Sequence, residues 1–259
     1  SKDSKILIPL SYKQNYDVFN YLITKSISNS EQIWNDSVSY SGRVSPVQNS
    51  YIGVERSKQT PVLLTIKTSI SDKNNESASS IGILSIELPS TSLSPGSYSL
   101  RIFNDNNKSD TAKFEFEVIW IDMPLALRNP QYAIESMYYI LNDEEYNKMK
   151  SGNSQEQANK LMNYWKAKDP TKNTPFNEAM TEYFRRVDYA FFNFQTVRDK
   201  DGSKTERGKI HILFGKPDNS DKVLSAGKQY EVWTYNKLKK KFHFELVSNG
   251  LYQLIKIEE

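Results

Sequence analysis

Cysteine is absent from this sequence of 259 residues, and histidine occurs only twice. The absence of cysteine excludes disulfide bonds, thiol catalysis and zinc–thiolate sites. It leaves the compartment open, since exported and cytosolic proteins can both dispense with this residue. Long apolar runs are also absent, so we expect no transmembrane segment, which would need roughly 20 apolar residues. The first residues, SKDSKILIPL, contain no apolar core of a signal peptide; a chain trimmed after an export signal would start this way, and so would a cytosolic chain.

Charge of one sign is not in large excess either. With 34 basic and 31 acidic residues the formal net charge is +3, so a nucleic-acid partner is not expected. Residues 202–209, GSKTERGK, differ from a phosphate-binding loop, because five residues separate the two glycines and Ile210 follows Lys209. No Gly-x-Ser-x-Gly elbow of a serine hydrolase occurs. We expect no cofactor and no metal site.

Aromatic residues, in contrast, are abundant: 16 tyrosines, 12 phenylalanines and 4 tryptophans. Each buried ring removes on the order of 150–250 Å² from water, so the composition favours a globular protein over a disordered one. Tyr132, Tyr138 and Tyr139 lie around the circumference of a predicted helix, and one sheet face cannot bury all three. The surplus of tyrosine therefore predicts an interaction surface, because exposed tyrosine is common in binding interfaces.

Up to residue 122 the apolar residues recur with period two, which is typical of strands. Short strands are predicted over residues 5–12, 16–27, 33–42, 61–70, 81–89, 96–104 and 112–120. The last two form a hairpin around the tip NDNNKSD, which we interpret as a solvated loop rather than a calcium site. This pair resembles the closing strands of immunoglobulin-like folds, with Tyr98 in place of the corner tyrosine. We expect an all-β immunoglobulin-like sandwich over residues 1–122.

After residue 122 the apolar spacing changes from two to 3.6 residues, which indicates helices. A first helix is predicted to begin with Asn129 as its cap and Pro130 at its first position. Further helices are predicted over residues 143–150, after a capping box of Ser154 and Gln157, and from Thr174 to about residue 198. Alternation then predicts strands over residues 208–215, 229–236, 241–248 and 251–258. Residues 123–259 are therefore expected to form a second domain, α+β, of three to four helices and a small antiparallel sheet.

An ordered set of residues runs through this second half. Its members are Gly202, Thr205, Arg207, Gly208, Gly215, Pro217 and Asp218, followed by Glu231 and Trp233. The set resembles the GWxTD domain of bacterial proteins, named for a Gly-Trp-x-Thr-Asp segment that continues as Arg-Gly, a short strand and Gly-x-Pro-Asp. Ser203 stands where that family has tryptophan and Glu206 where it has aspartate, which indicates a packing role for position 203 or a divergent member.

The GWxTD family has no established activity. Its members are typically exported or envelope-associated, often with a β-domain in front of the GWxTD domain. The resemblance therefore implies a periplasmic, outer-membrane-associated or secreted protein, and it informs the fold more than the function.

Arg207 is the most informative polar residue of the motif. A guanidinium at a turn forms two-pronged pairs with carboxylates, and Asp188, Asp218 and Glu231 are the candidate partners. We interpret Arg207 as the centre of a structural salt bridge, with ligand recognition and catalysis as the alternatives.

The other residues of this stretch are interpreted as structural. Gly208 and Gly215 are predicted to form the turns at the two ends of the strand 208–215. Pro217 would fix the outgoing backbone angle, and Asp218 would accept from backbone amides just ahead of it. His211 and His243 each lie in a predicted strand, as packed or surface residues rather than metal ligands.

Two charged runs have ordinary structural interpretations as well. Asp143, Glu144 and Glu145 in a first helical turn complement the helix dipole. Lysines 237, 239, 240 and 241 are predicted to occupy a hairpin turn, where lysine keeps a strand edge soluble. Binding of an anionic glycan, lipid headgroup or nucleic acid by this run is the alternative.

The leading hypothesis is a non-catalytic cell-envelope or secreted module that binds a protein or a surface polymer. Possible ligand-recognition residues are Arg207, Asp188, Tyr132 and Tyr139. The alternative is an enzyme of unrecognised type, with Arg207 and the carboxylates of Asp188, Asp218 and Glu231 in a cleft between the two domains. A structural module of a larger assembly is a third possibility. The ligand and the oligomeric state are not predicted.

Overall fold

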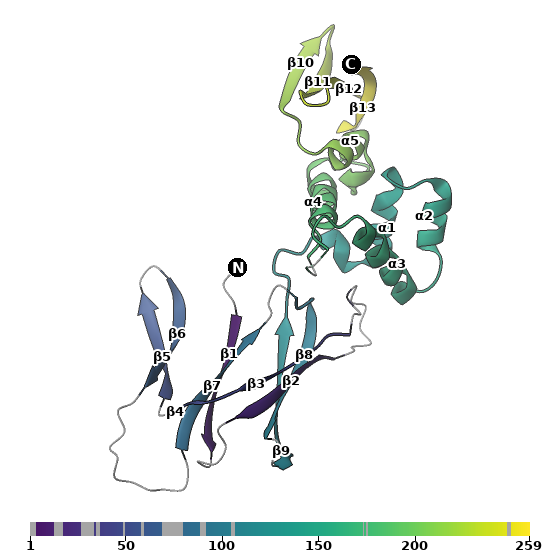
Figure 1. The fold of residues 1–259 in the computed structure, drawn as a ribbon. Coiled ribbons are helices and arrows are strands. Elements are labelled where there is room, and N and C mark those ends of the chain that lie inside the picture. Colours follow the sequence, from purple (N-terminus) through teal and green to yellow (C-terminus); the bar gives the residue numbers. More distant parts are fainter. Residues whose placement is uncertain are drawn as a thin grey trace. The chain divides into compact units, whose positions relative to one another are not determined.

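The computed structural model describes residues 4–12, 18–26, 34, 37–48, 50–57, 60–68, 80–88, 92–104, 107–172, 174, 176–247 and 250–259. The chain divides into two compact units, and the division falls between Ile119 and Trp120. The first unit consists of strands, whereas the second, to which Trp34 also belongs, combines helices with a sheet (Figure 1). In the described residues, no helix combines the length and apolar character that a membrane crossing requires. Because it contains both helices and antiparallel sheets, the protein is of the mixed α+β class.

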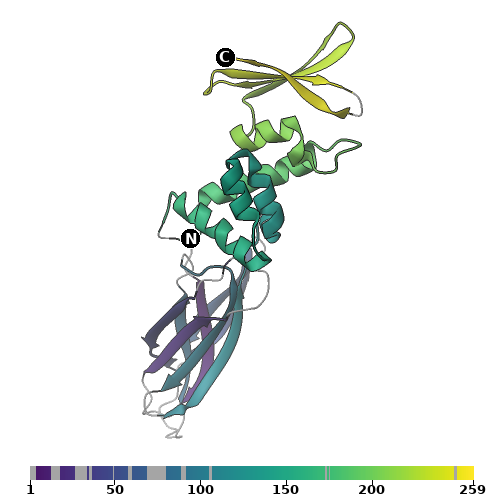
Figure 2. The same cartoon turned by 90° about the vertical axis from the view of Figure 1, so that its right-hand side faces the viewer.

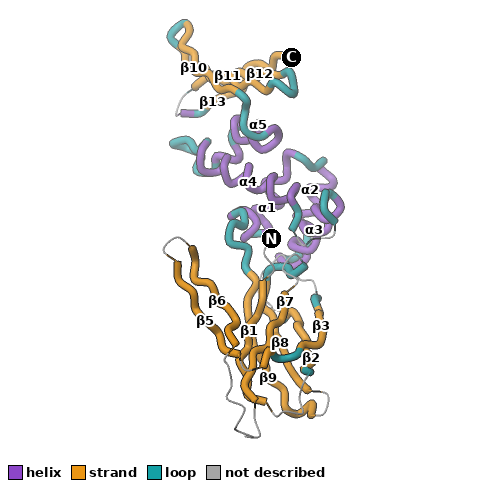
Figure 3. The backbone as a smooth tube through the Cα atoms, turned by 60° about the vertical axis from the view of Figure 1, so that its left-hand side comes forward, coloured by secondary structure: helices purple, strands orange, loops and turns teal. Residues whose placement is uncertain are grey.

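The first unit contains two antiparallel sheets and a hairpin (Figure 3). One sheet has the order β1 (Ser4–Tyr12), β7 (Ser80–Leu88), β4 (Val47–Gln48). The other has the order β3 (Ser39–Val44), β2 (Phe19–Lys25), β8 (Gly96–Asn104), β9 (Asn107–Val118). The hairpin is formed by β5 (Ser50–Ser57) and β6 (Thr60–Thr68). Strands were predicted near all of these except β4 and β5.

The two sheets of the first unit share one apolar core. Alternate residues of β8 are buried, and Tyr98, Leu100 and Ile102 are its large apolar side chains. They pack with Ile23 of β2 and with Leu84 and Ile86 of β7, which lies in the other sheet. Strand β9 begins at Asn107 and pairs back to Asn104, so most of the predicted loop NDNNKSD is strand; residues 105–106 of it lie outside the described residues.

The second unit begins with helices and ends with a sheet (Figure 2). Its α-helices are α1 (Pro130–Ser136), α2 (Asp143–Lys150), α3 (Ser154–Ala167), α4 (Glu178–Asn193) and α5 (Glu206–Phe214). Its short 3-10 helices are η1 (Leu125–Arg128), η2 (Met137–Tyr139) and η3 (Gly202–Lys204). Its antiparallel sheet is a meander of β10 (Asn219–Ser225), β11 (Lys228–Tyr235), β12 (Lys240–Leu246) and β13 (Tyr252–Glu258).

The helix starts follow side-chain capping. The Asn129 side chain accepts from the amide of Tyr132 at 3.2 Å with Pro130 at the first position, which confirms the predicted start of α1. The capping box predicted for Ser154 is wrong by one residue, because Asn153 and Glu156 form it. Helix α4 begins at Glu178 with Asn177 as its cap, not at Thr174, and it ends at Asn193.

The largest difference from the prediction concerns residues 208–215. This segment is not a strand but lies in helix α5, so the meander begins with β10, which was not predicted. The hydroxyl of Thr205 caps α5 by accepting from the amide of Gly208 at 3.0 Å. Gly215 ends the helix with φ at 79°, a conformation that favours glycine. Helix α5 contacts α4 on one side and β13 on the other.

Candidate functional site

The motif glycines permit a close approach of α4, η3 and α5. A Cβ atom on Gly202 would lie 2.2 Å from the carbonyl oxygen of Ala190 in α4. A Cβ atom on Gly208 would lie 2.1 Å from the carbonyl oxygen of Gly202. Both distances are to backbone atoms, which cannot move as a side chain can. The Gly202-to-Gly208 segment is therefore a packing junction of three helical elements, rather than a loop that cradles a phosphate or one that forms a sheet corner.

Arg207 forms a buried ion pair with Glu231 of β11. Its Nη1 atom donates to Glu231 Oε2 at 2.9 Å, and the two side chains are only 15% and 8% exposed. The guanidinium also lies 3.9 Å from the ring centre of Tyr252, which adds a cation–π contact. The structural interpretation of Arg207 predicted a carboxylate partner, and of the three candidates Glu231 is the one that pairs with it.

Glu231 is fully engaged inside the unit. Its Oε1 atom accepts from the hydroxyl of Ser220 at 3.0 Å and from the indole nitrogen of Trp233 at 2.7 Å. Its Oε2 atom is left for Arg207. Both charges are thus neutralised by named partners, and the pair connects helix α5 to the sheet.

Asp188 and Asp218 do not pair with Arg207 in the structure. The carboxylate of Asp188 accepts from the backbone amides of Leu125 and Ala126 at 2.6 and 2.9 Å, where η1 begins. The carboxylate of Asp218 accepts from the amide of Asn236 at 2.7 Å, in the turn between β11 and β12, rather than from amides just ahead of it as predicted. The four groups of the enzyme hypothesis are therefore not assembled into one constellation.

The histidines differ from each other in environment. His211 lies in helix α5 rather than in the predicted strand, is 6% exposed, and stacks on Tyr189 with the ring centres 4.4 Å apart. Burial, together with the nearby Arg186 guanidinium, lowers the pKa of His211 to about 4. His243 lies in β12 as predicted and contacts Glu258 at 2.9 Å. Among the described residues, no three metal-binding side chains are grouped.

A cleft of about 230 Å³ opens beside the motif, and we call it the tyrosine cleft. Its lining residues are Tyr132, Glu135, Ser136, Tyr138, Tyr139, Tyr146, Ser203 and Lys204. The hydroxyl of Tyr132 lies 3.2 Å from Asp201 and 3.1 Å from the hydroxyl of Ser203. The hydroxyl of Tyr139 donates to the carbonyl of Ser203 at 3.0 Å. The hydroxyl groups of two tyrosines are therefore hydrogen-bonded to residues of the motif segment. The number of tyrosines in the sequence does not reveal this arrangement.

Two phenols of the tyrosine cleft are uncharged, and its serine is hydrogen-bonded and buried. Burial raises the pKa of Tyr132 and of Tyr139, so both are neutral phenols. The Ser203 hydroxyl donates to Asp201 at 2.5 Å, and the residue is only 2% exposed, which places it out of reach as a nucleophile. Tyr138, in contrast, is 55% exposed, and its ring meets that of Tyr146 edge-on at 5.3 Å.

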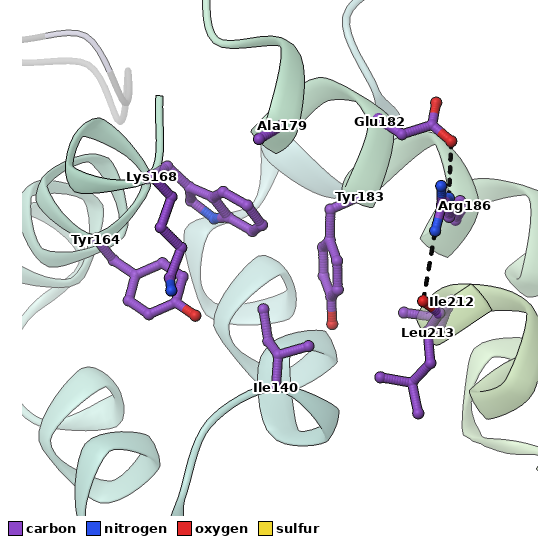
Figure 4. A pocket seen from close by; sticks show the side chains of 10 residues that line it. Ile140, Tyr164, Lys168, Ala179, Glu182, Tyr183, Arg186, Ile212 and Leu213 are labelled. Carbon is purple, nitrogen blue, oxygen red and sulfur yellow. Dashed lines mark hydrogen bonds and ion pairs between the residues drawn. The ribbon is translucent and has the colours of Figure 1, made fainter. Parts of the chain in front are cut away.

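A second cleft, of about 370 Å³, lies between α3, α4 and α5 (Figure 4). We call it the Trp165 cleft after one of its lining residues. Tyr132, Tyr138 and Tyr139 of the tyrosine cleft were predicted to form an interaction surface, whereas no residue of the Trp165 cleft was predicted to belong to a site. Trp165 is buried at 4% exposure, yet it also lines this cleft.

The fold and its motif define a helical domain closed by a four-stranded meander, with its polar motif residues paired inside. The chain belongs to the GWxTD domain family, whose model matches residues 97–258, more than half of the sequence. The match begins within β8, well before the resemblance noted from about residue 123. No curated protein and no solved structure matches this chain.

The two departures from the family motif have clear positions. Glu206, which replaces aspartate, accepts through its carboxylate from the amide of Leu254 in β13. Ser203, which replaces tryptophan, lines the tyrosine cleft. Position 206 thus keeps a carboxylate, which connects α5 to the sheet. Position 203, beside the tyrosine cleft, has a small serine side chain in place of the larger indole of the family motif.

Proposed function

We propose that the first unit is an immunoglobulin-like sandwich. The order β4-β7-β1 corresponds to strands D, E and B of that fold, and β3-β2-β8-β9 corresponds to C′, C, F and G. The hairpin of β5 and β6 is then an insertion between strands D and E. The hydroxyl of Tyr98, at the start of strand F, donates to the carbonyl of Ser94 at 2.7 Å, which is the bond of a tyrosine corner.

We expect Tyr98→Phe to lower the free energy of unfolding by about 1 kcal/mol, because it removes one buried hydrogen bond. Tyr40→Phe is the matched control, since the Tyr40 hydroxyl donates to the Ser92 carbonyl at 3.2 Å in a partly buried position. Urea denaturation, followed by a spectroscopic signal of the first unit, measures both changes in the free energy of unfolding. Equal effects of the two substitutions would argue against a tyrosine corner at Tyr98.

We propose further that the protein is a non-catalytic module of the cell envelope, or a secreted one, that binds another protein through the tyrosine cleft. The observation that carries this proposal is the position of the cleft: its tyrosines are fixed on the family motif while Tyr138 stays exposed. Tyrosine offers a large amphipathic contact with few rotatable bonds, which suits it to protein interfaces. A surface polymer is the alternative ligand of the same cleft.

The charges at the cleft favour a protein over a uniformly charged polymer. Glu135 and Lys204 lie on the cleft together, and Lys204 Nζ is 4.0 Å from Glu135 and 3.6 Å from Asp201. A mixed rim around aromatic side chains is typical of protein interfaces, where the rim is polar and the centre aromatic.

Capture experiments test this proposal. The purified chain, immobilised, is exposed to an envelope extract of the organism that encodes it, and captured proteins are quantified by mass spectrometry. We expect Tyr138→Ala to reduce capture of the main partner at least tenfold, because central interface tyrosines contribute about 2 kcal/mol or more. Phe192→Ala is the matched control, since Phe192 is 57% exposed and does not line the cleft.

Three outcomes would contradict the proposal. Equal capture by wild type and Tyr138→Ala would show that the partner binds elsewhere. Equal loss in Tyr138→Ala and Phe192→Ala would indicate nonspecific apolar adhesion. Binding on a glycan array but not to protein would favour the surface polymer.

The envelope location rests on family resemblance and is tested separately. Cells that express the full-length gene product are fractionated, and the protein is located by antibody. Recovery in the periplasmic, outer-membrane or secreted fraction supports the proposed location, and recovery in the cytosol alone contradicts it.

A further inference from the structure

The Trp165 cleft has the size of a small-molecule site. Its volume of about 370 Å³ falls in the range of ligand pockets, which is roughly 300–1,000 Å³. Its lining residues are Ile140, Tyr164, Trp165, Lys168, Ala179, Glu182, Tyr183, Arg186, Ile212 and Leu213. Figure 4 shows the aliphatic side chains of Ile140 and Leu213 on one side of the cleft and the aromatic rings of Tyr164 and Tyr183 beside them.

One buried donor at this cleft lacks an acceptor. The indole Nε1 of Trp165 is buried and makes no hydrogen bond in the part of the chain that the structure describes. Buried polar atoms without a partner are few in native proteins, and each one needs an explanation. The hydroxyl of the neighbouring Tyr183, in contrast, has an acceptor, because it donates to the carbonyl of Ser136 at 2.7 Å. Because this N–H of Trp165 has almost no exposed surface, an acceptor supplied by a ligand would reach it only after the side chains that cover it move aside.

The charges of the cleft leave one cation in excess. Arg186 donates to Glu182 at 2.7 Å and approaches the carbonyl of Leu213 at 3.5 Å (Figure 4). Lys168 has no carboxylate partner among the described residues, and its ammonium lies 5.0 Å from the ring centre of Tyr164. Two cations and one carboxylate therefore line the cleft, which favours a ligand with a single negative charge.

We propose that the Trp165 cleft binds a small monocarboxylate with an apolar chain, such as a medium-chain fatty acid. Its carboxylate pairs with the ammonium of Lys168, and it accepts from the indole N–H of Trp165 once the side chains that cover this N–H have moved aside. Its apolar chain packs against Ile140, Ile212 and Leu213. The proposal is independent of the tyrosine cleft, because the two clefts share no lining residue.

Titration with octanoate tests this inference, with 1-octanol and octylammonium as probes of equal chain length. Calorimetry gives the affinities, and ¹⁵N–¹H correlation spectra follow the indole N–H signals of the four tryptophans. We expect octanoate to bind about tenfold more tightly than either probe, the difference that one charge-assisted hydrogen bond provides. Among the indole signals, the one that disappears in Trp165→Phe should shift most.

Two matched variants identify the cation. Lys168→Gln should weaken octanoate binding about tenfold. Lys166→Gln, which changes an exposed lysine in the last turn of α3 outside the cleft, should leave octanoate binding unchanged. Tyr138→Ala should also leave octanoate binding unchanged, which separates this cleft from the tyrosine cleft. Circular dichroism verifies that each variant is folded. If Trp165→Phe does not fold, the loss of octanoate binding in Lys168→Gln still tests the site.

Several results would overturn the inference. Equal affinity for octanoate and 1-octanol would show that no carboxylate is recognised. Equal weakening by Lys168→Gln and Lys166→Gln would show a general charge effect. An unshifted Trp165 signal at saturation would place the ligand elsewhere, and binding of a leucine-terminated peptide without binding of octanoate would make the cleft a peptide site.

Discussion

Glu231→Ala should lower the free energy of unfolding by about 3–5 kcal/mol, the loss expected when one partner of a buried ion pair is removed. The substitution leaves the Arg207 guanidinium, which is 15% exposed, without its carboxylate. It also removes the acceptor of the Trp233 indole nitrogen and of the Ser220 hydroxyl. Urea denaturation followed by tryptophan fluorescence and by circular dichroism measures the change.

Glu245→Ala is the matched control for this prediction. Glu245 lies in the neighbouring strand β12 and pairs with Lys228 at 2.6 Å, but Lys228 is 59% exposed. Ion pairs at the surface contribute little, because water and salt screen them. We therefore expect a far smaller loss of stability than for Glu231→Ala, and similar losses in the two variants would contradict the structural role of the buried pair.

The second large effect is expected at Gly208. Helix propensity alone predicts that alanine at this position of α5 raises the free energy of unfolding by about 1 kcal/mol. The new Cβ atom, however, would lie 2.1 Å from the carbonyl oxygen of Gly202. We expect Gly208→Ala to lower the free energy of unfolding by about 2–3 kcal/mol, since such an overlap forces backbone shifts.

Gly227→Ala separates this steric effect from the general effect of losing a glycine. Gly227 has φ at 77° in the turn between β10 and β11, and a Cβ atom added there would meet no other atom within 4 Å. Its substitution should lower the free energy of unfolding by about 1 kcal/mol through the positive φ alone. A stabilised Gly208→Ala variant would show that η3 and α5 are not packed as closely as the structure indicates.

The elements with an unambiguous local signal were predictable from the sequence. Asn129 followed by Pro130 is a strong helix start, and α1 begins there. The strand over residues 96–104 alternates so regularly that its predicted bounds are those of β8. In both cases the local chemistry and the tertiary environment favour the same structure.

Helix α5 shows where local patterns mislead. Ile210, Ile212 and Phe214 alternate as in a strand, and a short apolar run of this kind fits a helix equally well. The signals that decide are at its ends: Thr205 as the cap and Gly215 after the last turn. Gly215 was interpreted as a turn at the end of a strand and Thr205 only as a member of the motif, although a capping threonine and a terminal glycine are also the boundaries of a helix.

The candidate site was predictable only in part, for a similar reason. The residue types around Arg207 implied a carboxylate partner, but the choice of Glu231 depends on the packing of α5 against the sheet. The two clefts have walls from several helices, so no single stretch of sequence contains their pattern. A buried indole without an acceptor becomes visible only when the positions of its neighbours are known.

The central claim is that Arg207 stabilises the fold and that binding occurs at the tyrosine cleft. The double variant Arg207→Met with Glu231→Gln tests it most directly, because it removes both charges and keeps Oε1 of residue 231 for Ser220 and Trp233. An uncharged, well-packed replacement of a buried ion pair is often neutral for stability. We therefore predict that the double variant is more stable than Glu231→Ala and captures the partner as wild type does. A folded double variant that no longer captures the partner would contradict the claim and make Arg207 a ligand-binding or catalytic residue.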